Sequence, residues 1–297
     1  MIIIDYSQVS IAAITLFKNE LHKSDDEVRN IIRHVILSSI LTYKKKYGQE
    51  YGNVVIACDG RKYWRKGIFP YYKGSRKKNR EKSDLNWTLI FDIIAEIKQD
   101  LIDYFPYKVV NVQRAEADDV IAVLCEWTQT NELQEGIFED PQKVVIISSD
   151  GDFLQLQQWD NINQYSPNVK KLLHLNKREL HEKKITHIVK GDSGDGIPSI
   201  LNKDDVLITE GIRQTPVSAK RLAEFIEQGK DACRTDEERR NWDRNEQLVS
   251  FDFIPKDIKE EIVNTYLACT SKRDSMRMMN YLMNKKCRLL LDELNNF

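Results

Sequence analysis

The hydrophobic residues of this chain gather in short continuous runs, and acidic residues follow these runs. The runs are 2–4 before Asp5, 54–58 before Asp59, 109–112 before a group that starts at Glu116, and 144–149 before Asp150. Runs of β-branched residues without polar alternation are typical of parallel strands buried on both faces of a sheet. Ligands of such sheets bind outside the carboxyl ends of the strands. We therefore expect the acidic residues to converge on one edge of a sheet.

The segments between these runs carry apolar residues at the spacing of amphipathic helices. Residues 27–47, 87–105 and 116–127 show this spacing, and Pro106 ends the second segment. Strands that alternate with helices predict an α/β fold with a doubly wound, mostly parallel sheet. We place this domain at residues 1–176.

Strand signals fade after residue 176, and helical spacing dominates the rest of the chain. Residues 177–190 have a helical pattern, and 191–196 form a glycine-rich turn. A further helix is predicted from a cap at Thr215, with Pro216 at its first position, to a stop at Gly229. These signals predict a smaller C-terminal helical module at residues 177–297.

The acidic residues are candidate metal ligands, because carboxylates crowded together cannot all stay ionised without a counter-charge. A hard cation such as Mg²⁺ is the simplest counter-charge. The candidates are Asp5, Asp59, Glu116, Asp118, Asp119, Asp150, Asp152, Asp192 and Asp195. Other interpretations stay open, since Asp-Gly-Asp is also typical of an Asx turn and acids in a first helical turn complement the helix dipole. Glu116 and Asp118 can share a site only where the helix start is irregular.

Charge is segregated along the chain, although the formal net charge is only −1. Residues 61–82, named here the basic segment, contain ten Lys and Arg residues and one acid, Glu81. Aromatic residues are interleaved with them. Cations beside rings that can stack on bases are typical of sites for single-stranded nucleic acid, whereas a charge run alone is more often a solvated face.

Composition and missing motifs exclude several classes of protein. No apolar run approaches the roughly 20 residues that a membrane span needs. The five cysteines are scattered without a C-x-x-C pair, and no phosphate-binding G-x-x-x-x-G-K-[ST] loop or H-E-x-x-H pair occurs. We expect a cytoplasmic protein with no membrane partner.

The order of the motifs resembles that of the flap endonucleases, the family of structure-specific 5′ nucleases, and is most similar to its T-even-type phage ribonuclease H members. The similar motifs are Ile4-Asp5, Cys58-Asp59, 115–119, 148–153 and Gly191-Asp192 with Asp195, together with 63–65, 71–73 and 78–80. Each motif alone is weak, but five in this order are specific. One departure is a polar insertion, 201–214, where the family usually continues from Ile197-Pro198 into a glycine-rich hairpin.

The resemblance implies a PIN-like nuclease core that holds two Mg²⁺ ions, for which Mn²⁺ would substitute. By motif, the first ion would be surrounded by Asp5, Asp59, Glu116, Asp118 and Asp150, with Asp119 close by. The second would be held, largely through waters, by Asp152, Asp192 and Asp195. The implied activity is 5′ to 3′ exonuclease and flap endonuclease hydrolysis of DNA and RNA·DNA duplexes with a 5′ flap or end, for removal of RNA primers in DNA replication.

The basic segment would be the arch that gathers the 5′ single strand, with Lys73 and Arg65 nearest the scissile phosphate. Further nucleic-acid contacts are expected from Arg61, Lys66, Tyr72, Arg76, Lys77, Lys78 and Arg80, and from Lys220 and Arg221 on the duplex backbone. A single-stranded-DNA-binding protein and a replication clamp are plausible partners from the family role. Two rival hypotheses remain: a PIN-like ribonuclease that cuts single-stranded RNA, and a nucleic-acid binder without catalysis.

Overall fold

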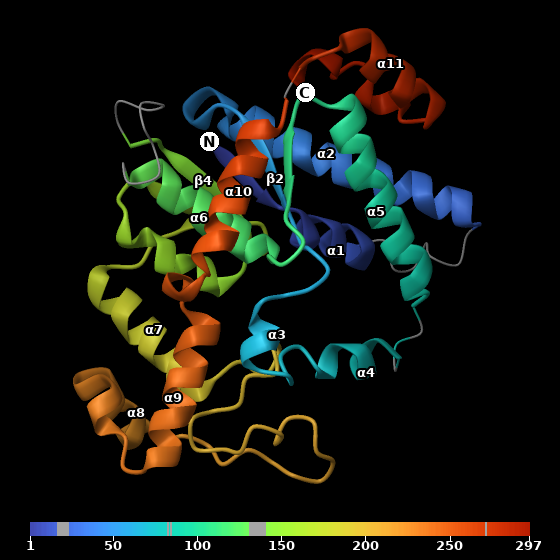
Figure 1. The fold of residues 1–297 in the computed structure, drawn as a ribbon. Helices are drawn as coiled ribbons and strands as arrows, with labels where there is room; N and C mark the ends of the chain where they lie inside the picture. Colours follow the sequence, from blue (N-terminus) through green and yellow to red (C-terminus); the bar gives the residue numbers. More distant parts are fainter. Residues whose placement is uncertain (17–23, 82, 84, 131–140, 271) are drawn as a thin grey trace. The chain divides into compact units, whose positions relative to one another are not determined.

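The computed structural model describes all residues except 17–23, 82, 84, 131–140 and 271 (Figure 1). The described residues form two compact units, and the chain passes more than once between them. The sheet unit comprises Met1–Arg61, Leu85–Leu173 and Lys256–Phe297, and the helical unit comprises Lys62–Asp84 and His174–Pro255. The sequence analysis predicted a nuclease domain at residues 1–176 and a duplex-binding module at residues 177–297. This assignment of functions to the two parts stays a prediction.

A six-stranded sheet lies at the centre of the sheet unit. The strands are β1 (Ile2–Asp5), β2 (Val54–Cys58), β3 (Lys108–Asn111), β4 (Val144–Ile147), β5 (Ile162–Ser166) and β6 (Lys171–Leu173). Their order is β3-β2-β1-β4-β5-β6, and every pair is parallel except β5 with β6. The predicted doubly wound, mostly parallel sheet is confirmed. The direction of winding reverses between β1 and β4, where sheets of this kind bind ligands.

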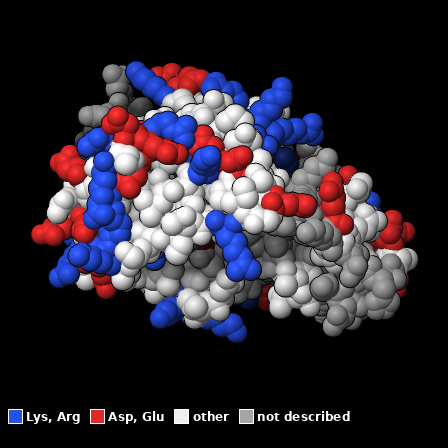
Figure 2. All heavy atoms as spheres, turned by 90° about the horizontal axis from the view of Figure 1, so that it is seen from below, with Lys and Arg blue, Asp and Glu red and all other residues white. Residues whose placement is uncertain are grey.

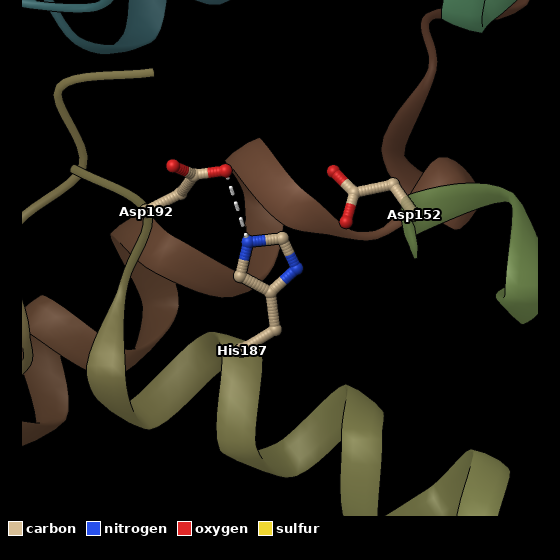
Figure 3. A group of neighbouring side chains, drawn as sticks. All are labelled: Asp152, His187 and Asp192. Carbon is tan, nitrogen blue, oxygen red and sulfur yellow. Dashed lines mark ion pairs between the residues drawn. The ribbon is translucent and has the colours of Figure 1, made fainter. Parts of the chain in front are cut away.

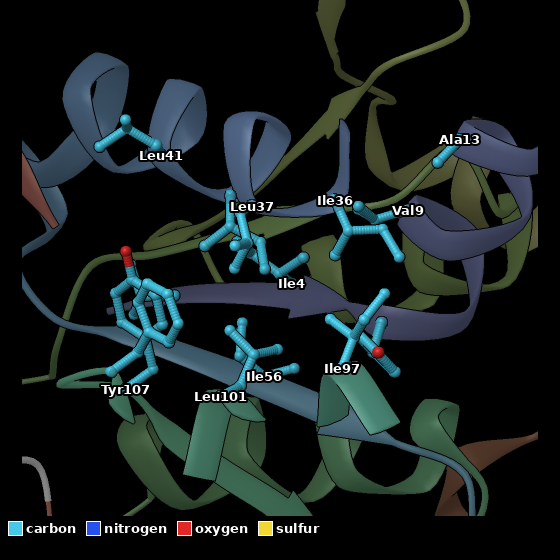
Figure 4. Packing of buried hydrophobic residues seen from close by; sticks show 14 of the residues in the cluster. Ile4, Val9, Ala13, Ile36, Leu37, Leu41, Ile56, Ile97, Leu101 and Tyr107 are labelled. Carbon is cyan, nitrogen blue, oxygen red and sulfur yellow. The ribbon is translucent and has the colours of Figure 1, made fainter. Parts of the chain in front are cut away.

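Both faces of the sheet are covered, which explains the continuous apolar runs. Figure 4 shows Ile4 and Ile56 packed among side chains of α2 (Asp25–Tyr51) and α5 (Trp87–Tyr104). Ile3 and Val55, which point to the opposite face, are also fully buried. On that face α6 (Ala117–Gln129) packs against β1 and β2, and α10 (Lys256–Ala268) packs on α6. The unit is completed by α1 (Tyr6–Leu16), α11 (Ser275–Asn284) and the 3₁₀ turns η3 (Gly151–Gln158), η6 (Arg288–Leu290) and η7 (Leu294–Asn296).

Two strands, β5 and β6, carried no recognisable sequence signal. β5 reads Ile-Asn-Gln-Tyr-Ser, and its Gln164 is fully buried although it is polar. β6 is a three-residue edge strand with exposed side chains. Hydrophobic alternation therefore could not identify either strand.

The helical unit contains short helices around a small core. They are α3 (Arg65–Ile68), α4 (Ser75–Glu81), α7 (Lys177–Lys190), α8 (Ala219–Gln228) and α9 (Asp236–Val249), with η4 (Gly229–Ala232) and η5 (Phe251–Phe253). Phe69, Ile188, Phe225 and Trp242 are among the buried core residues. The helical character predicted for the C-terminal part of the chain is thus confirmed.

The start predicted for the helix near Pro216 is wrong by three residues. α8 begins at Ala219, and the side chain of its N-cap Ser218 accepts a 3.2 Å hydrogen bond from the Arg221 N–H. The Thr215 N–H instead donates to the Asn202 side chain at 2.7 Å, which keeps Thr215 in the preceding loop. The predicted stop at Gly229 is confirmed, because this residue caps α8 with a φ of 59°.

Buried asparagines hold the polar insertion 201–214 and the turn before it. The Asn241 side chain donates to the Ile200 and Asn202 carbonyls at 2.9 and 3.0 Å. The Asn245 side chain donates to the Ile188 and Pro198 carbonyls at 2.7 and 2.9 Å. Both asparagines lie on α9 and are fully buried. Because these bonds satisfy buried backbone carbonyls, they fix the turn before the insertion and its start at Asn202, whereas residues 208–213 are exposed.

Candidate metal and nucleic-acid sites

Asp5 and Asp59 lie at the carboxyl ends of β1 and β2, and neutral donors hold both carboxylates. Asp5 accepts hydrogen bonds from the Gln8 N–H at 3.0 Å and from the Ser148 hydroxyl at 3.1 Å. Asp59 accepts from the Ala117 N–H at 3.0 Å and from the Ser7 hydroxyl. Within the described part of the chain, no Lys, Arg or His lies within ion-pair distance of these two residues.

The electrostatics of Asp5 indicate a crowded carboxylate group. Asp5 is 6% exposed, and burial raises its pKa to about 6, with further upward contributions from Asp59 and Asp150. Hydrogen bonds from Gln8 and Ser148 oppose this increase. Several carboxylate oxygens close together in a poorly solvated place are the donor set that a hard divalent cation prefers.

The start of α6 brings Glu116 to the same edge. The Gly60 N–H donates to the Ala115 carbonyl at 2.8 Å, so the chain after β2 runs directly against the loop before Glu116. Glu116 is the N-cap of α6 with an extended backbone, and the Asp119 carboxylate accepts its N–H at 2.9 Å. Glu116 therefore lies before the first helical residue, so the helical spacing does not fix its direction relative to Asp118. Asp119 is buried and serves as a capping residue.

Asp150 is fixed by residues that sequence reasoning missed. The Asp150 N–H donates to the Ser148 hydroxyl at 3.1 Å, and this hydroxyl donates in turn to Asp5. Gln164 on β5 donates to the Ser148 and Asp150 carbonyls at 2.9 and 2.6 Å. The Asp150 side chain also accepts from the Asp152 N–H at 2.9 Å, so the Asx turn forms as well. We call Asp5, Asp59, Glu116 and Asp150 the carboxylate rim.

In the helical unit, Asp192 organises the glycine-rich turn. Its Oδ1 accepts from the Gly194 and Asp195 N–H groups at 2.7 and 3.2 Å. Its Oδ2 lies 3.5 Å from Nε2 of His187, and Figure 3 shows this pair at the end of α7. The hydrogen bond from His187 is the main cause that lowers the pKa of Asp192 to about 2. No histidine had been predicted to have a role.

Asp195 contacts three residues of the basic segment. Its carboxylate lies 3.5 Å from Lys73 Nζ and 2.5 Å from the Arg76 guanidinium, and it accepts a 2.8 Å hydrogen bond from the Tyr72 hydroxyl. Tyr72 itself is buried. The structure thus joins predicted metal-site and nucleic-acid residues in one cluster.

Two predicted arginines are engaged within the helical unit. The Arg65 side chain is buried, with Nε donating to the Leu248 carbonyl at 2.9 Å and the guanidinium over the Trp64 ring. Arg221 is also buried and pairs with Glu224 at 2.9 Å and Glu238 at 2.7 Å. Burial and these partners engage both arginines within the helical unit, and their predicted phosphate contacts stay predictions. Lys220, one residue earlier, is exposed.

The other residues predicted to contact nucleic acid differ in their exposure to solvent, and the structure does not describe the side chains of all of them. Arg61 and Lys66 are exposed and Arg80 is half-buried, whereas the side chains of Lys77 and Lys78 lie outside the described residues. The face in Figure 2 carries blue basic groups interspersed with red acidic groups. On this face, the described basic groups do not form one continuous patch. Among the helices of the described residues, none is both long and apolar enough to cross a membrane.

Comparison with known proteins assigns the family. The model of the 5′-3′ exonuclease N-terminal resolvase-like domain matches residues 1–185, and that of the T4 RNase H C-terminal region matches residues 181–297. The chain is 34% identical over 272 residues to the ribonuclease H of Enterobacteria phage T4, covering 89% of this chain and 85% of the phage protein.

Solved structures with the same fold come from phage T5. One, co-crystallised with metal ions, covers 90% of this chain and 97% of its own with a TM-score of 0.61. Another, a flap endonuclease complex with DNA and metal ions, covers 91% and 99% with a TM-score of 0.62. Both are 18% identical in sequence. On these matches, the chain belongs to the metal-ion-dependent 5′-3′ exonuclease and flap endonuclease family and is a 5′ nuclease of the ribonuclease H type.

Proposed function

We propose that this protein hydrolyses phosphodiester bonds of DNA and RNA·DNA duplexes from a 5′ end or at a 5′ flap, and thereby removes RNA primers during DNA replication. The observation that carries the proposal is the carboxylate rim at the reversal point of the sheet, in a chain that is 34% identical to a phage ribonuclease H. Its substrates would be DNA and RNA·DNA hybrids.

The donor chemistry of the rim fits Mg²⁺, with Mn²⁺ as a substitute. Asp5, Asp59, Glu116, Asp118 and Asp150 would hold the first ion. Of the residues predicted for the second ion, Asp152 belongs to the sheet unit, while Asp192 and Asp195 belong to the helical unit. Bound Mg²⁺ would lower the pKa of an attacking water and neutralise charge on the phosphate oxygens.

The protein residues around the rim would orient its carboxylates. Ser7, Gln8 and the Ala117 N–H each occupy one lone-pair direction of Asp5 or Asp59, which leaves the remaining directions for a cation. Since these donors are neutral, they fix geometry without cancelling the charge. Of the basic residues, Lys73 would be the catalytic cation placed on the scissile phosphate, where charge develops in the transition state. Exposed Lys220 would contact the duplex backbone.

The decisive experiment measures cleavage of 5′-labelled flap, nicked and RNA·DNA substrates, with Mg²⁺ and with EDTA. Wild-type protein should cut at or near the 5′ end only with Mg²⁺. Asp150→Asn should lower the rate by roughly a thousandfold or more while binding to DNA is retained or strengthened, because a ligand and a negative charge are lost together. Residual activity within about tenfold of wild type would remove Asp150 from the site.

The same assay tests the two rival functions. A PIN-like ribonuclease would cut unstructured RNA better than a 5′ flap. A binder without catalysis would shift these substrates in a gel but cleave none of them at any Mg²⁺ concentration. Preference for the flap or the duplex 5′ end with Mg²⁺ would exclude both.

A further inference from the structure

Three donors of the basic segment converge on one carboxylate, that of Asp195. Lys73 Nζ and the Tyr72 hydroxyl approach Oδ2 at 3.5 and 2.8 Å, and the Arg76 guanidinium approaches Oδ1 at 2.5 Å. Both oxygens are therefore engaged by donors. Two of the three donors are positively charged, so the cluster carries more positive than negative charge.

The surroundings hold Lys73 in place. Its side chain is 9% exposed, and Nζ lies 5.2 Å from the centre of the Tyr63 ring and 5.1 Å from that of Tyr72. Aromatic faces at this distance stabilise a cation. The Lys73 N–H also donates to the Asp195 carbonyl at 2.7 Å. Lys73 thus meets Asp195 through both its backbone and its side chain.

The backbone of the basic segment is shaped for this contact. Lys73 has a φ of 56°, a conformation that non-glycine residues rarely adopt. Gly196, with a φ of 75°, lies against the same turn: a Cβ on it would be 3.0 Å from the Tyr71 carbonyl oxygen and 3.3 Å from the Lys73 nitrogen. The strained backbone of Lys73 therefore lies directly against Gly196, where a Cβ would be crowded. The surrounding structure must hold this strained conformation in place.

A carboxylate that accepts from a lysine, an arginine and a hydroxyl resembles a phosphodiester in its contacts. Both are anions with two acceptor oxygens, and arginine binds both through charge-assisted hydrogen bonds. We propose that Asp195 is an internal substitute for substrate phosphate: it neutralises and holds Lys73 and Arg76 in the free protein, and a phosphate of the bound strand displaces it. This proposal rests on the proposed function for the identity of the strand, but the resting contact can be tested without cleavage.

This role differs from that of Asp192, although both acids lie in the same turn. Asp192 contacts His187 and the backbone of the turn, and no ion pair joins it to a lysine or arginine of the described basic segment. Asp192→Asn is therefore a matched control, since it also removes one negative charge from the turn.

The first test is the accessibility of the Lys73 amine in the full-length protein in EDTA, measured by mass spectrometry after brief acylation with an N-hydroxysuccinimide ester. Asp195→Asn should increase labelling of Lys73 by about fivefold or more, because ion pairing and burial both protect the amine. Asp192→Asn should change it by less than about twofold, and exposed Lys220 serves as the internal standard. Equal labelling of Lys73 in wild type and Asp195→Asn would overturn the proposal.

The second test is binding of a short single-stranded oligonucleotide, again in EDTA so that metal binding does not contribute. Asp195→Asn should tighten the dissociation constant by about fivefold, and Asp192→Asn by clearly less. In wild type, binding of the oligonucleotide should change the labelling of Lys73. Labelling should rise if the phosphate displaces Asp195 and leaves the amine accessible. Labelling should disappear if the phosphate displaces Asp195 and itself covers Nζ. No change on saturation would overturn displacement. If the labelling result holds but no substrate is cleaved with Mg²⁺, the resting contact stands and the proposed nuclease function fails.

Discussion

The two units of this protein differ in the partners that contact their clustered carboxylates. In the sheet unit, Asp5 and Asp59 are held by hydroxyl and backbone N–H donors, and no basic residue among those described lies within ion-pair distance. In the helical unit, basic side chains contact the acids: His187 lies beside Asp192, and the positively charged Lys73 and Arg76 lie beside Asp195.

The difference separates carboxylates that only neutral donors contact from carboxylates that meet basic side chains. Neutral donors orient Asp5 and Asp59 but leave their charges uncompensated, and burial then raises the pKa of Asp5. Near Asp192, the hydrogen bond from His187 outweighs burial and lowers the pKa. A cluster of acids in a sequence therefore does not identify metal ligands until the neighbours of each acid are known.

The largest effect is expected from a substitution that moves the carboxylate rim but leaves every carboxylate in the sequence. In Gly60→Ala, the new Cβ would lie 2.1 Å from the Val112 carbonyl oxygen and 2.6 Å from that of Gln113, so the loop that carries Glu116 must move. We expect cleavage to fall by at least about a hundredfold, since misplacement near 1 Å has this cost. Gly67→Ala is the control in the helical unit, because a Cβ there meets nothing within 4 Å. Comparable activity of the two variants would contradict the close packing at Gly60.

The charge of Asp5 can be removed directly. Its pKa rises from 3.8 to about 6 on folding, so the folded protein keeps a proton that the unfolded chain releases between these values. Without metal, stability should therefore fall as pH rises from about 4 through 6. Asp5→Asn should raise the free energy of unfolding in EDTA at pH 7 by up to about 3 kcal/mol and remove stabilisation by Mg²⁺. Chemical denaturation at pH 4, 5, 6 and 7 would contradict this if the difference between variant and wild type did not vary with pH.

Arg221 and Lys220 should differ although they are adjacent. Arg221→Ala leaves Glu224 and Glu238 without a shared partner and should lower the free energy of unfolding by about 2 kcal/mol. Lys220→Ala should leave stability unchanged but flatten the slope of log affinity for duplex against log salt by roughly 0.9. Denaturant unfolding and a salt titration measure the two effects. If the salt dependence of duplex affinity were the same in Lys220→Ala as in wild type, Lys220 would not contact the duplex backbone.

The smallest effect is expected at His187. The lowered pKa of Asp192 means that its contribution to stability is present above pH 4 and is lost as pH falls toward 2. Because the Asp192 side chain is 36% exposed, solvent screening limits this contribution to less than about 1 kcal/mol. His187→Gln should therefore reduce stability slightly at pH 5 and not at all at pH 2. A loss of equal size at both pH values would attribute the effect to packing rather than to charge.

The sequence by itself determined the strands β1 to β4, the helices around them and the acids that follow these strands. Continuous apolar runs and helical spacing follow from burial on both faces, which is a local pattern that residues carry wherever the chain runs. The motif order also identified the family, which the comparisons confirm.

Tertiary structure alone decided which charged residues meet. Ser148 and Gln164 are ordinary polar residues in sequence, yet they fix Asp150, the first from the position just after β4 and the second from β5. Arg65 and Lys73 both belong to the basic segment, but Leu248 is the partner of the first and Asp195 that of the second. Periodicity reports whether a position is buried, but not which distant group neutralises a buried charge, because that contact depends on elements more than a hundred residues apart.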